Sequence, residues 1–425
     1  MLSRTLTIIL AVTLVILAQA SASAPSYVGK ILVSSSGSFA RFRVQYNAGN
    51  PNRNVMYMAG STIVAVSPSS PTQYSSYSLP AGTDSPVGIF LYGSVGGYVA
   101  ITPQPGKLVV LNCAQPSNPY GGSCSLTQAA SITLPVAAST EWVDIGIGFT
   151  SGQGRYLYLI AADRTVAVIA ANQNSSPSGW SVVRTFTLST PSTAAYPNVV
   201  GLEGGSSMGV VFVSLAAASS NSTGAPGAIL TLDAASSAVT RSTFVPNPAF
   251  TVTSGGSADL IAVVGALNAS TSIAHTFSDV SFPHGYQVSW PSNGPIVGGC
   301  NIVGEVTSTS MPLFVVADTG SGLALRRVAP TAGSVSPAVV SSDSAVFGVD
   351  CMAAENFLSG GEDIWLPARE SSANVVLVYS SSGLVAASTA KRAAAAAAAT
   401  SARIESLALH GSDSGCADPD MDHAG

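Results

Sequence analysis

The feature that most constrains the fold is a strand phrase that recurs along the chain. In each copy, a short run of Val, Ile, Leu and Tyr ends at a Gly, Ser or Asn turn, and a second apolar run follows. These second runs are Ser61–Ser67, Lys107–Asn112, Thr165–Ala170, Ala228–Asp233, Leu323–Val328 and Asn374–Tyr379. Their spacing is roughly 50 residues, with one wide gap between 228 and 323. Strand-only repeats of this length predict the blades of a β-propeller.

Period-2 alternation bounded by Gly, Pro, Ser and Asn traces seven four-strand units. They cover residues 39–80, 86–135, 141–189, 197–246, 249–291, 295–341 and 344–390. The fifth unit has the weakest pattern, and the first strand of the seventh is predicted over 345–351. The sequence therefore predicts an all-β propeller of seven blades. A count of six to eight stays open.

One strand, Tyr27–Val33, has no place in these units, while the seventh unit lacks a good outer strand. We therefore expect the N-terminal strand to complete the last blade, so that no sheet edge is left open. A pair of β-sandwiches is the competing architecture, because strand spacing alone would also suit it.

Many first strands contain an apolar residue followed by Gly. The steps are Val87-Gly88, Ile145-Gly146, Val200-Gly201, Val297-Gly298 and Phe347-Gly348. Glycine allows backbones to approach closely, which is what the innermost strands around an axis require.

The two ends differ from the repeats. Arg4, the apolar stretch 5–18 and the small residues Ala22-Ser23-Ala24 are typical of a secretory signal peptide over 1–24. An uncleaved anchor is the alternative, and Ala18-Gln19-Ala20 offers a second cleavage site. After the propeller at 25–390, seven consecutive alanines predict a short helix over 391–409, followed by a disordered polar tail to residue 425. We expect a secreted, extracellular protein with no membrane span in the mature chain.

The low content of charged residues disfavours nucleic acid as a partner. Charged residues make up 9% of the chain and lysine occurs at three positions, so there is no basic patch for nucleic acid. Disorder of the main part is also disfavoured, because it usually needs low hydrophobicity and high net charge.

Cysteines and sequons supply the local chemistry. A disulfide between Cys113 and Cys124 would close the turn-rich segment between them. Cys300 and Cys351 occupy matching places in successive units and are predicted to pair, which leaves Cys416 over. Asn174, Asn221 and Asn268 begin Asn-X-Ser/Thr sequons in turn-like segments, so we expect one or two of them to carry glycans.

Two segments resemble NHL-repeat propellers and related six- to seven-bladed propellers. They are 86–112, which ends in Lys-Leu-Val-Val-Leu-Asn, and Met311–Asp318, a strand that ends in Ala-Asp. The resemblance extends over most of 27–390 in rhythm and is specific at few positions. It implies a scaffold with a ligand site on one face, and the fold alone does not set the function.

Two further hypotheses concern ligands. Secreted propellers of the lactonase type hold calcium at the axis with oxygen ligands, and the first strands here carry Asp144, Asn198, Glu203, Asn301 and Asp350. No family motif maps onto these residues, so the sequence predicts no cofactor, with calcium as the alternative. A lectin would need exposed aromatic residues, for which the candidates are Tyr74, Tyr77, Tyr92 and Trp142. The sequence favours a non-catalytic binding or structural propeller at the cell surface or in the extracellular matrix, with an extracellular protein or glycan as ligand. A calcium-dependent lactonase or esterase and a lectin are the alternatives.

Overall fold

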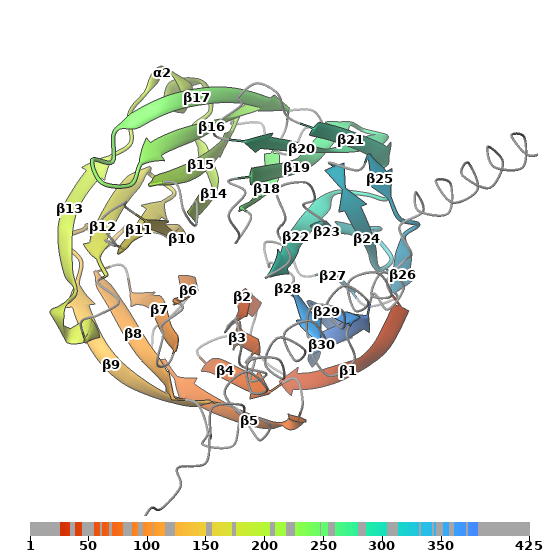
Figure 1. The fold of residues 1–425 in the computed structure, drawn as a ribbon, viewed down its shortest axis with the longest axis horizontal. Coiled ribbons are helices and arrows are strands. Elements are labelled where there is room, and N and C mark those ends of the chain that lie inside the picture. Colours follow the sequence, from red (N-terminus) through yellow and green to blue (C-terminus); the bar gives the residue numbers. More distant parts are fainter. Residues whose placement is uncertain are drawn as a thin grey trace, which may run out of the picture.

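A computed structural model of the 425-residue chain shows a ring of β-sheets around a central axis (Figure 1). The structure describes residues 26–34, 39–44, 55–59, 62–67, 70–79, 87–91, 97–104, 106–114, 124–149, 155–171, 176–204, 209–217, 226–246, 248–253, 260–278, 286–303, 313–330, 333–341, 344–345, 352–356, 361–370 and 373–380. The predicted signal peptide, C-terminal helix and tail lie outside these residues.

Each of the first five blades is a four-stranded antiparallel sheet whose strands follow one another in the chain. Blade 1 contains β2 (Phe39–Val44), β3 (Val55–Ala59), β4 (Thr62–Ser67) and β5 (Ser70–Ser78). Blade 2 contains β6 (Val87–Leu91), β7 (Gly97–Gln104), β8 (Lys107–Ala114) and β9 (Ser125–Thr133). Blade 3 contains β10 (Trp142–Phe149), β11 (Arg155–Ala161), β12 (Thr165–Ala170) and β13 (Ser181–Thr187). Blade 4 contains β14 (Asn198–Gly204), β15 (Val210–Ala216), β16 (Pro226–Asp233) and β17 (Val239–Pro246). Blade 5 contains β18 (Pro248–Thr253), β19 (Leu260–Asn268), β20 (Thr271–Ser278) and β21 (Tyr286–Pro291).

Blades 6 and 7 are joined into one ten-stranded sheet. Blade 6 contains β22 (Ile296–Val303), β23 (Leu313–Asp318), β24 (Leu323–Ala329), β25 (Ser334–Val335) and β26 (Val339–Ser341). Blade 7 contains β27 (Ser344–Ala345), β28 (Met352–Asn356), β29 (Gly361–Glu370), β30 (Ala373–Ser380) and β1 (Ser26–Ser34). The join is a parallel pairing of the two innermost strands, in which Ile302 lies opposite Ala353.

The N-terminal strand closes the ring. β1 pairs antiparallel with β30, from Ser26 opposite Ser380 to Ser34 opposite Asn374. Tyr27 also contacts the buried ring of Tyr379 edge to face, with the ring centroids 5.7 Å apart. The all-β propeller closed by its N-terminal strand is thus confirmed, and a pair of β-sandwiches is excluded (Figure 1).

Burial explains why the third strands gave the strongest sequence signal. Middle strands are covered on both faces by neighbouring blades, so all seven residues of β15 are buried, as are the four central residues of β12. The outer strand β13 instead alternates between exposed and half-buried residues. The apolar clusters accordingly lie between blades. One joins Trp142 and Leu157 of blade 3 to Leu108 of blade 2.

Two strand predictions need correction. The inner strand of blade 7 is β28 at Met352–Asn356 rather than a strand over 345–351, which lies almost entirely outside the described residues. β28 is short and lacks Val, Ile, Leu and aromatic residues, and its place is set by pairing with β29 and β22, which leaves little signal in its own sequence. The outer strand of blade 6, predicted as one strand over 335–340, is split into β25 and β26 around the buried Ser336. The Ser336 hydroxyl accepts from the backbone N–H of Arg327 at 2.9 Å.

Two short helices occur in the described chain, the 3-10 helix η1 (Pro177–Gly179) and α2 (Pro191–Ala195). Thr190 caps α2, because its hydroxyl accepts from the backbone N–H of Thr193 at 3.2 Å. Neither helix, nor any other helix within the described ranges, is long and apolar enough to cross a membrane.

Candidate functional site

The connections between strands leave the ring on two faces. We call the face where the first strand of each blade ends the exit face, and the face where that strand begins the entry face. Antiparallel order brings the connections after first and third strands to the exit face. Several of these are long, including 45–54, 115–124 and 304–312. On the entry face, most second-to-third turns are as short as 60–61 or 269–270, whereas the connections 134–141 and 188–197 between blades and the connection 217–225 are long. Long connections on a rigid scaffold are where binding sites usually lie.

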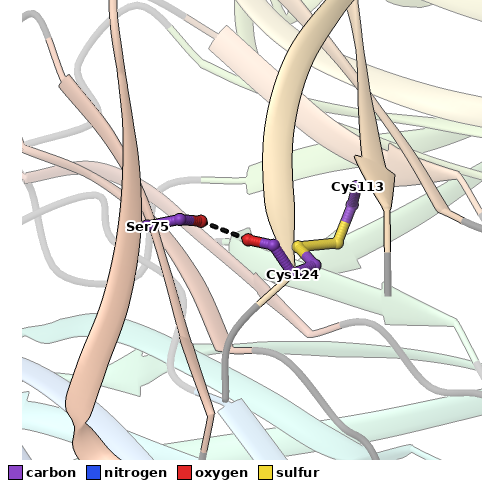
Figure 2. Close-up of a disulfide and its surroundings, with 3 residues drawn as sticks. All are labelled: Ser75, Cys113 and Cys124. Carbon is purple, nitrogen blue, oxygen red and sulfur yellow. Dashed lines mark hydrogen bonds between the residues drawn. A yellow bond between two sulfur atoms is a disulfide. The ribbon is translucent and has the colours of Figure 1, made fainter. Parts of the chain in front are cut away.

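One exit-face connection is closed by a disulfide. Cys113 at the end of β8 and Cys124 just before β9 form the predicted bond, with their Cα atoms 5.2 Å apart (Figure 2). Both residues are fully buried in a cluster with Ile63 of blade 1. The bond therefore fixes both ends of the 115–123 connection to the core between blades 1 and 2.

Side-chain hydrogen bonds connect the region around Cys124 to the outer strand of blade 1. The hydroxyl of Ser75 in β5 donates to the backbone carbonyl of Cys124 (Figure 2). Two residues further along β5, the Tyr77 hydroxyl donates to Gln128 Oε1 of β9 at 2.9 Å. Outer strands of neighbouring blades are thus joined by side chains beside the disulfide.

Asp144, the first of the predicted calcium ligands, is buried and joins two blades. Its Oδ1 accepts from the backbone N–H of Ile145 at 2.7 Å, and its Oδ2 accepts from the backbone N–H of Leu202 in β14 at 2.8 Å. Both carboxylate oxygens therefore hold backbone at the contact between the inner strands of blades 3 and 4.

The other predicted calcium ligands do not lie beside Asp144 in the described structure. Asn198 begins β14, where its side-chain amide donates to the carbonyl of Ala217 at 3.0 Å, and Glu203 lies five residues further along the strand, half-buried. Asn301 is in β22 with its side chain outside the described part, and Asp350 lies wholly outside it. Among the described residues, no three His, Cys, Asp or Glu side chains form a group that could hold a metal ion. The calcium set therefore stays a hypothesis.

Glycines bring the inner strands of blades 3 and 4 into close contact, as their apolar-Gly steps predicted. A Cβ on Gly146 would lie 2.0 Å from Leu202 Cδ2. A Cβ on Gly204, a position the sequence pattern did not identify, would lie 1.4 Å from the Ile147 carbonyl oxygen. No side chain fits there without a backbone shift.

A turn of blade 4 is held by blade 3. The buried Tyr158 of β11 donates its hydroxyl to the Ala234 carbonyl at 2.8 Å and lies 2.8 Å from the Ser237 hydroxyl. Burial raises the pKa of the Tyr158 phenol above its usual value of 10.0. From the outer strand β13, Arg184 donates to the carbonyls of Ala235 and Ser236.

The turn also has its own internal support. The hydroxyl of Ser236 donates to Asp233 Oδ1 at 2.7 Å, and the Ser236 backbone N–H donates to the same atom at 2.6 Å. These hydrogen bonds lower the pKa of the Asp233 carboxyl. None of these residues stands out in the sequence, because an Asp with a Ser three residues later in a turn is common and gives no hint of a partner in another blade.

The remaining predicted sites are only partly visible. Cys300 is buried and disulfide-bonded, with its partner outside the described residues, so the Cys300–Cys351 bond stays a prediction. Asn174 and Asn221 also lie outside. Asn268 is exposed in the β19–β20 turn, where its Oδ1 accepts from the Ser270 backbone N–H at 2.9 Å.

Aromatic residues proposed for a lectin site do not gather on the described surface. Trp142 is 6% exposed within the cluster between blades 2 and 3, and Tyr77 is half-buried. The side chains of Tyr74 and Tyr92 lie outside the described part.

Comparisons with known proteins show the fold alone. No family model matches the chain, and no curated protein matches it. BBS1N in complex with ARL6DN is 11% identical over 84% of this chain and 97% of its own, with a TM-score of 0.54. The β-propeller domain of Cps50 (Swd1) from Myceliophteria thermophila is 10% identical over 84% of this chain and 99% of its own, with a TM-score of 0.53. Raptor from Chaetomium thermophilum is 11% identical over 85% of this chain but only 29% of its own, with a TM-score of 0.51. These structures share the β-propeller fold with this chain. The resemblance to NHL repeats stays a prediction.

Proposed function

We propose that this protein is a secreted, non-catalytic propeller glycoprotein that binds an extracellular protein or glycan on its exit face, at the cell surface or in the matrix. The observation that carries the proposal is the disulfide-anchored connection between β8 and β9 on the exit face. The exit face combines long connections with a buried disulfide that anchors one of them, whereas most second-to-third turns on the entry face are tight.

The interior supports a scaffold role. Asp144 and Tyr158, two buried polar side chains between blades 3 and 4, both bond to backbone groups of blade 4. Groups used in this way stabilise the ring and are not available to a substrate. A further argument comes from the BBS1N propeller, which was solved in complex with ARL6DN, so this architecture holds a protein partner in that case. Secretion rests on the N-terminal segment of the sequence.

A glycan array and a cell-surface binding assay with the full chain, purified from the culture medium, test the proposal. We expect binding that withstands a chelator and falls at least tenfold in Tyr120→Ala, which changes the single aromatic residue of the disulfide-closed segment. The control is Ser321→Ala in the exposed β23–β24 turn of the entry face, which should bind like the unchanged protein.

Other outcomes would favour the alternatives. Hydrolysis of a lactone or ester that stops with chelator would contradict the non-catalytic function and favour the calcium-dependent enzyme. An equal loss of binding in Tyr120→Ala and Ser321→Ala would contradict a binding site on the exit face. Retention of the chain inside the cell would contradict secretion.

A further inference from the structure

We infer that Asn268 is a site of N-linked glycosylation and that its glycan covers part of the entry face. This inference rests on the proposed entry of the chain into the secretory pathway. It goes beyond the sequon itself, because the structure describes the acceptor side chain of Asn268 and the topology places its turn on the entry face.

The turn presents the whole sequon to solvent. β19 ends at Asn268 and β20 begins at Thr271, which lies opposite Asn268 in the sheet register. Asn268, Ala269 and Ser270 are all exposed. An oligosaccharide attached there would meet no strand of its own blade.

The acceptor side chain is oriented by the serine that the sequon requires. Oδ1 of Asn268 accepts from both the Ser270 backbone N–H at 2.9 Å and the Ser270 hydroxyl at 3.0 Å. These bonds hold the carbonyl side of the carboxamide in a local Asx turn. Within the described part of the chain, Nδ2 of Asn268 makes no hydrogen bond, so the atom that becomes glycosylated is left accessible.

Two other described asparagines use their side chains to hold other segments of the chain. Nδ2 of the half-buried Asn198 donates to Ala217, and Oδ1 of Asn293 accepts from the guanidinium of Arg326 at 2.7 and 3.0 Å. Both side chains support the fold. Asn268 instead bonds only within its own turn, so a modification there breaks no contact between strands.

The reaction needs only a lipid-linked oligosaccharide pyrophosphate as co-reactant. Nδ2 forms a bond to the anomeric carbon of the sugar while the bond from that carbon to the pyrophosphate oxygen breaks. Nδ2 loses one proton to a base of the transferase, and the lipid pyrophosphate leaves. No oxidation or reduction takes place.

The topology also assigns the sequons to faces. Asn268 lies in a second-to-third turn, on the entry face, and the β15–β16 connection that contains Asn221 is the equivalent one in the preceding blade. The β12–β13 connection that contains Asn174 leaves from the exit face. A glycan on Asn268 therefore marks the face opposite the proposed binding surface.

The experiment maps glycans on the full chain made in eukaryotic secretory cells, once with its own N-terminal segment and once with a heterologous signal in place of residues 1–24. The secreted protein is treated with N-glycosidase in heavy-oxygen water, and the peptide that spans Asn268 is measured by mass spectrometry. We expect conversion of Asn268 to a heavy-labelled Asp in most molecules. Asn268→Gln and Ser270→Ala should each lose one glycan step in gel mobility, whereas Ser270→Thr, which preserves the sequon, should keep it.

The two arms separate this inference from the proposed function. Protein that reaches the medium under the heterologous signal with Asn268 unlabelled would overturn the inference, whether or not Asn174 or Asn221 is modified. If Asn268 is labelled in protein exported by the heterologous signal, but the chain is not exported by its own N-terminal segment, the glycosylation site is supported and secretion is contradicted. Loss of the glycan in Ser270→Thr as well as Ser270→Ala would count against a sequon-dependent modification.

Discussion

The contact between blades 3 and 4 and the contact between blades 6 and 7 hold the ring together in different ways. Between blades 3 and 4, inner strands meet through glycines and through one buried carboxylate that accepts a backbone N–H of the neighbour. Between blades 6 and 7, the inner strands share a parallel ladder, and a disulfide-bonded cysteine lies on β22. The first contact depends on particular side chains. The second relies on backbone pairing, which most residues can provide, so we expect the first to be more sensitive to substitution.

The largest effect should come from Gly204→Ala, which tests the close approach of blades 3 and 4. The new Cβ would overlap the Ile147 carbonyl, so the inner strands must separate at a cost of about 3 kcal/mol or more. Urea unfolding measures this loss of stability. Gly106→Ala is the matched control, because its Cβ would meet only the Leu134 carbonyl oxygen at 3.7 Å. Equal stability of the two variants would refute the close contact.

Cys300→Ser tests the contact between blades 6 and 7. Loss of a native disulfide typically costs about 2–4 kcal/mol, and the same urea unfolding measures it. Ile302 lies opposite Ala353 in the parallel pair, so the two strands are offset by 51 residues. Cys300 and Cys351 are separated by the same 51 residues. Non-reducing peptide mapping should therefore recover these two cysteines linked. A link between Cys300 and Cys416 would show that this disulfide does not join blades 6 and 7.

Asp144→Ala should be the next in size. It removes the acceptor for the backbone N–H groups of Ile145 and Leu202 in a buried place, which costs about 2 kcal/mol. Asp144→Asn should lose less, because the amide keeps one oxygen. Faster hydrogen exchange at the Leu202 amide in Asp144→Ala would identify the broken contact, and unchanged exchange would argue against it.

The smallest effect is predicted for Tyr158→Phe, which removes the hydroxyl that bonds to the Ala234 carbonyl, at about 1 kcal/mol. Because burial raises the pKa of this phenol in the folded state, the unfolded chain releases its proton first as the pH rises above 10.0. Stability should therefore be fully present below that pH and fall as the pH rises through the folded-state pKa. Measured unfolding between neutral and alkaline pH should show a shallower decline in Tyr158→Phe, and parallel profiles would assign the decline to other groups.

The sequence predicted most of the fold because a middle strand of a propeller is buried on both faces. The apolar runs at Thr165–Ala170 and Ala228–Asp233 became β12 and β16 within two residues. The inner strand of blade 7 was misplaced, because Met352–Asn356 has no Val, Ile, Leu or aromatic residue and its place comes from two partner strands. Asp144 was identified as a polar residue near the axis, but its role as a link between blades depends on the position of Leu202, 58 residues away.

The sequence by itself determined the repeat, the closing strand and the disulfide between Cys113 and Cys124, because apolar alternation and cysteine spacing are local properties. Only the tertiary structure decided which polar groups hold blades together, which glycines cannot be replaced, and which face receives each connection. Those properties depend on which residues of one blade meet the next, and residues 50 or more positions apart carry no local pattern that reveals their contact. The separation of the two faces, on which the proposed binding function rests, belongs to this second group.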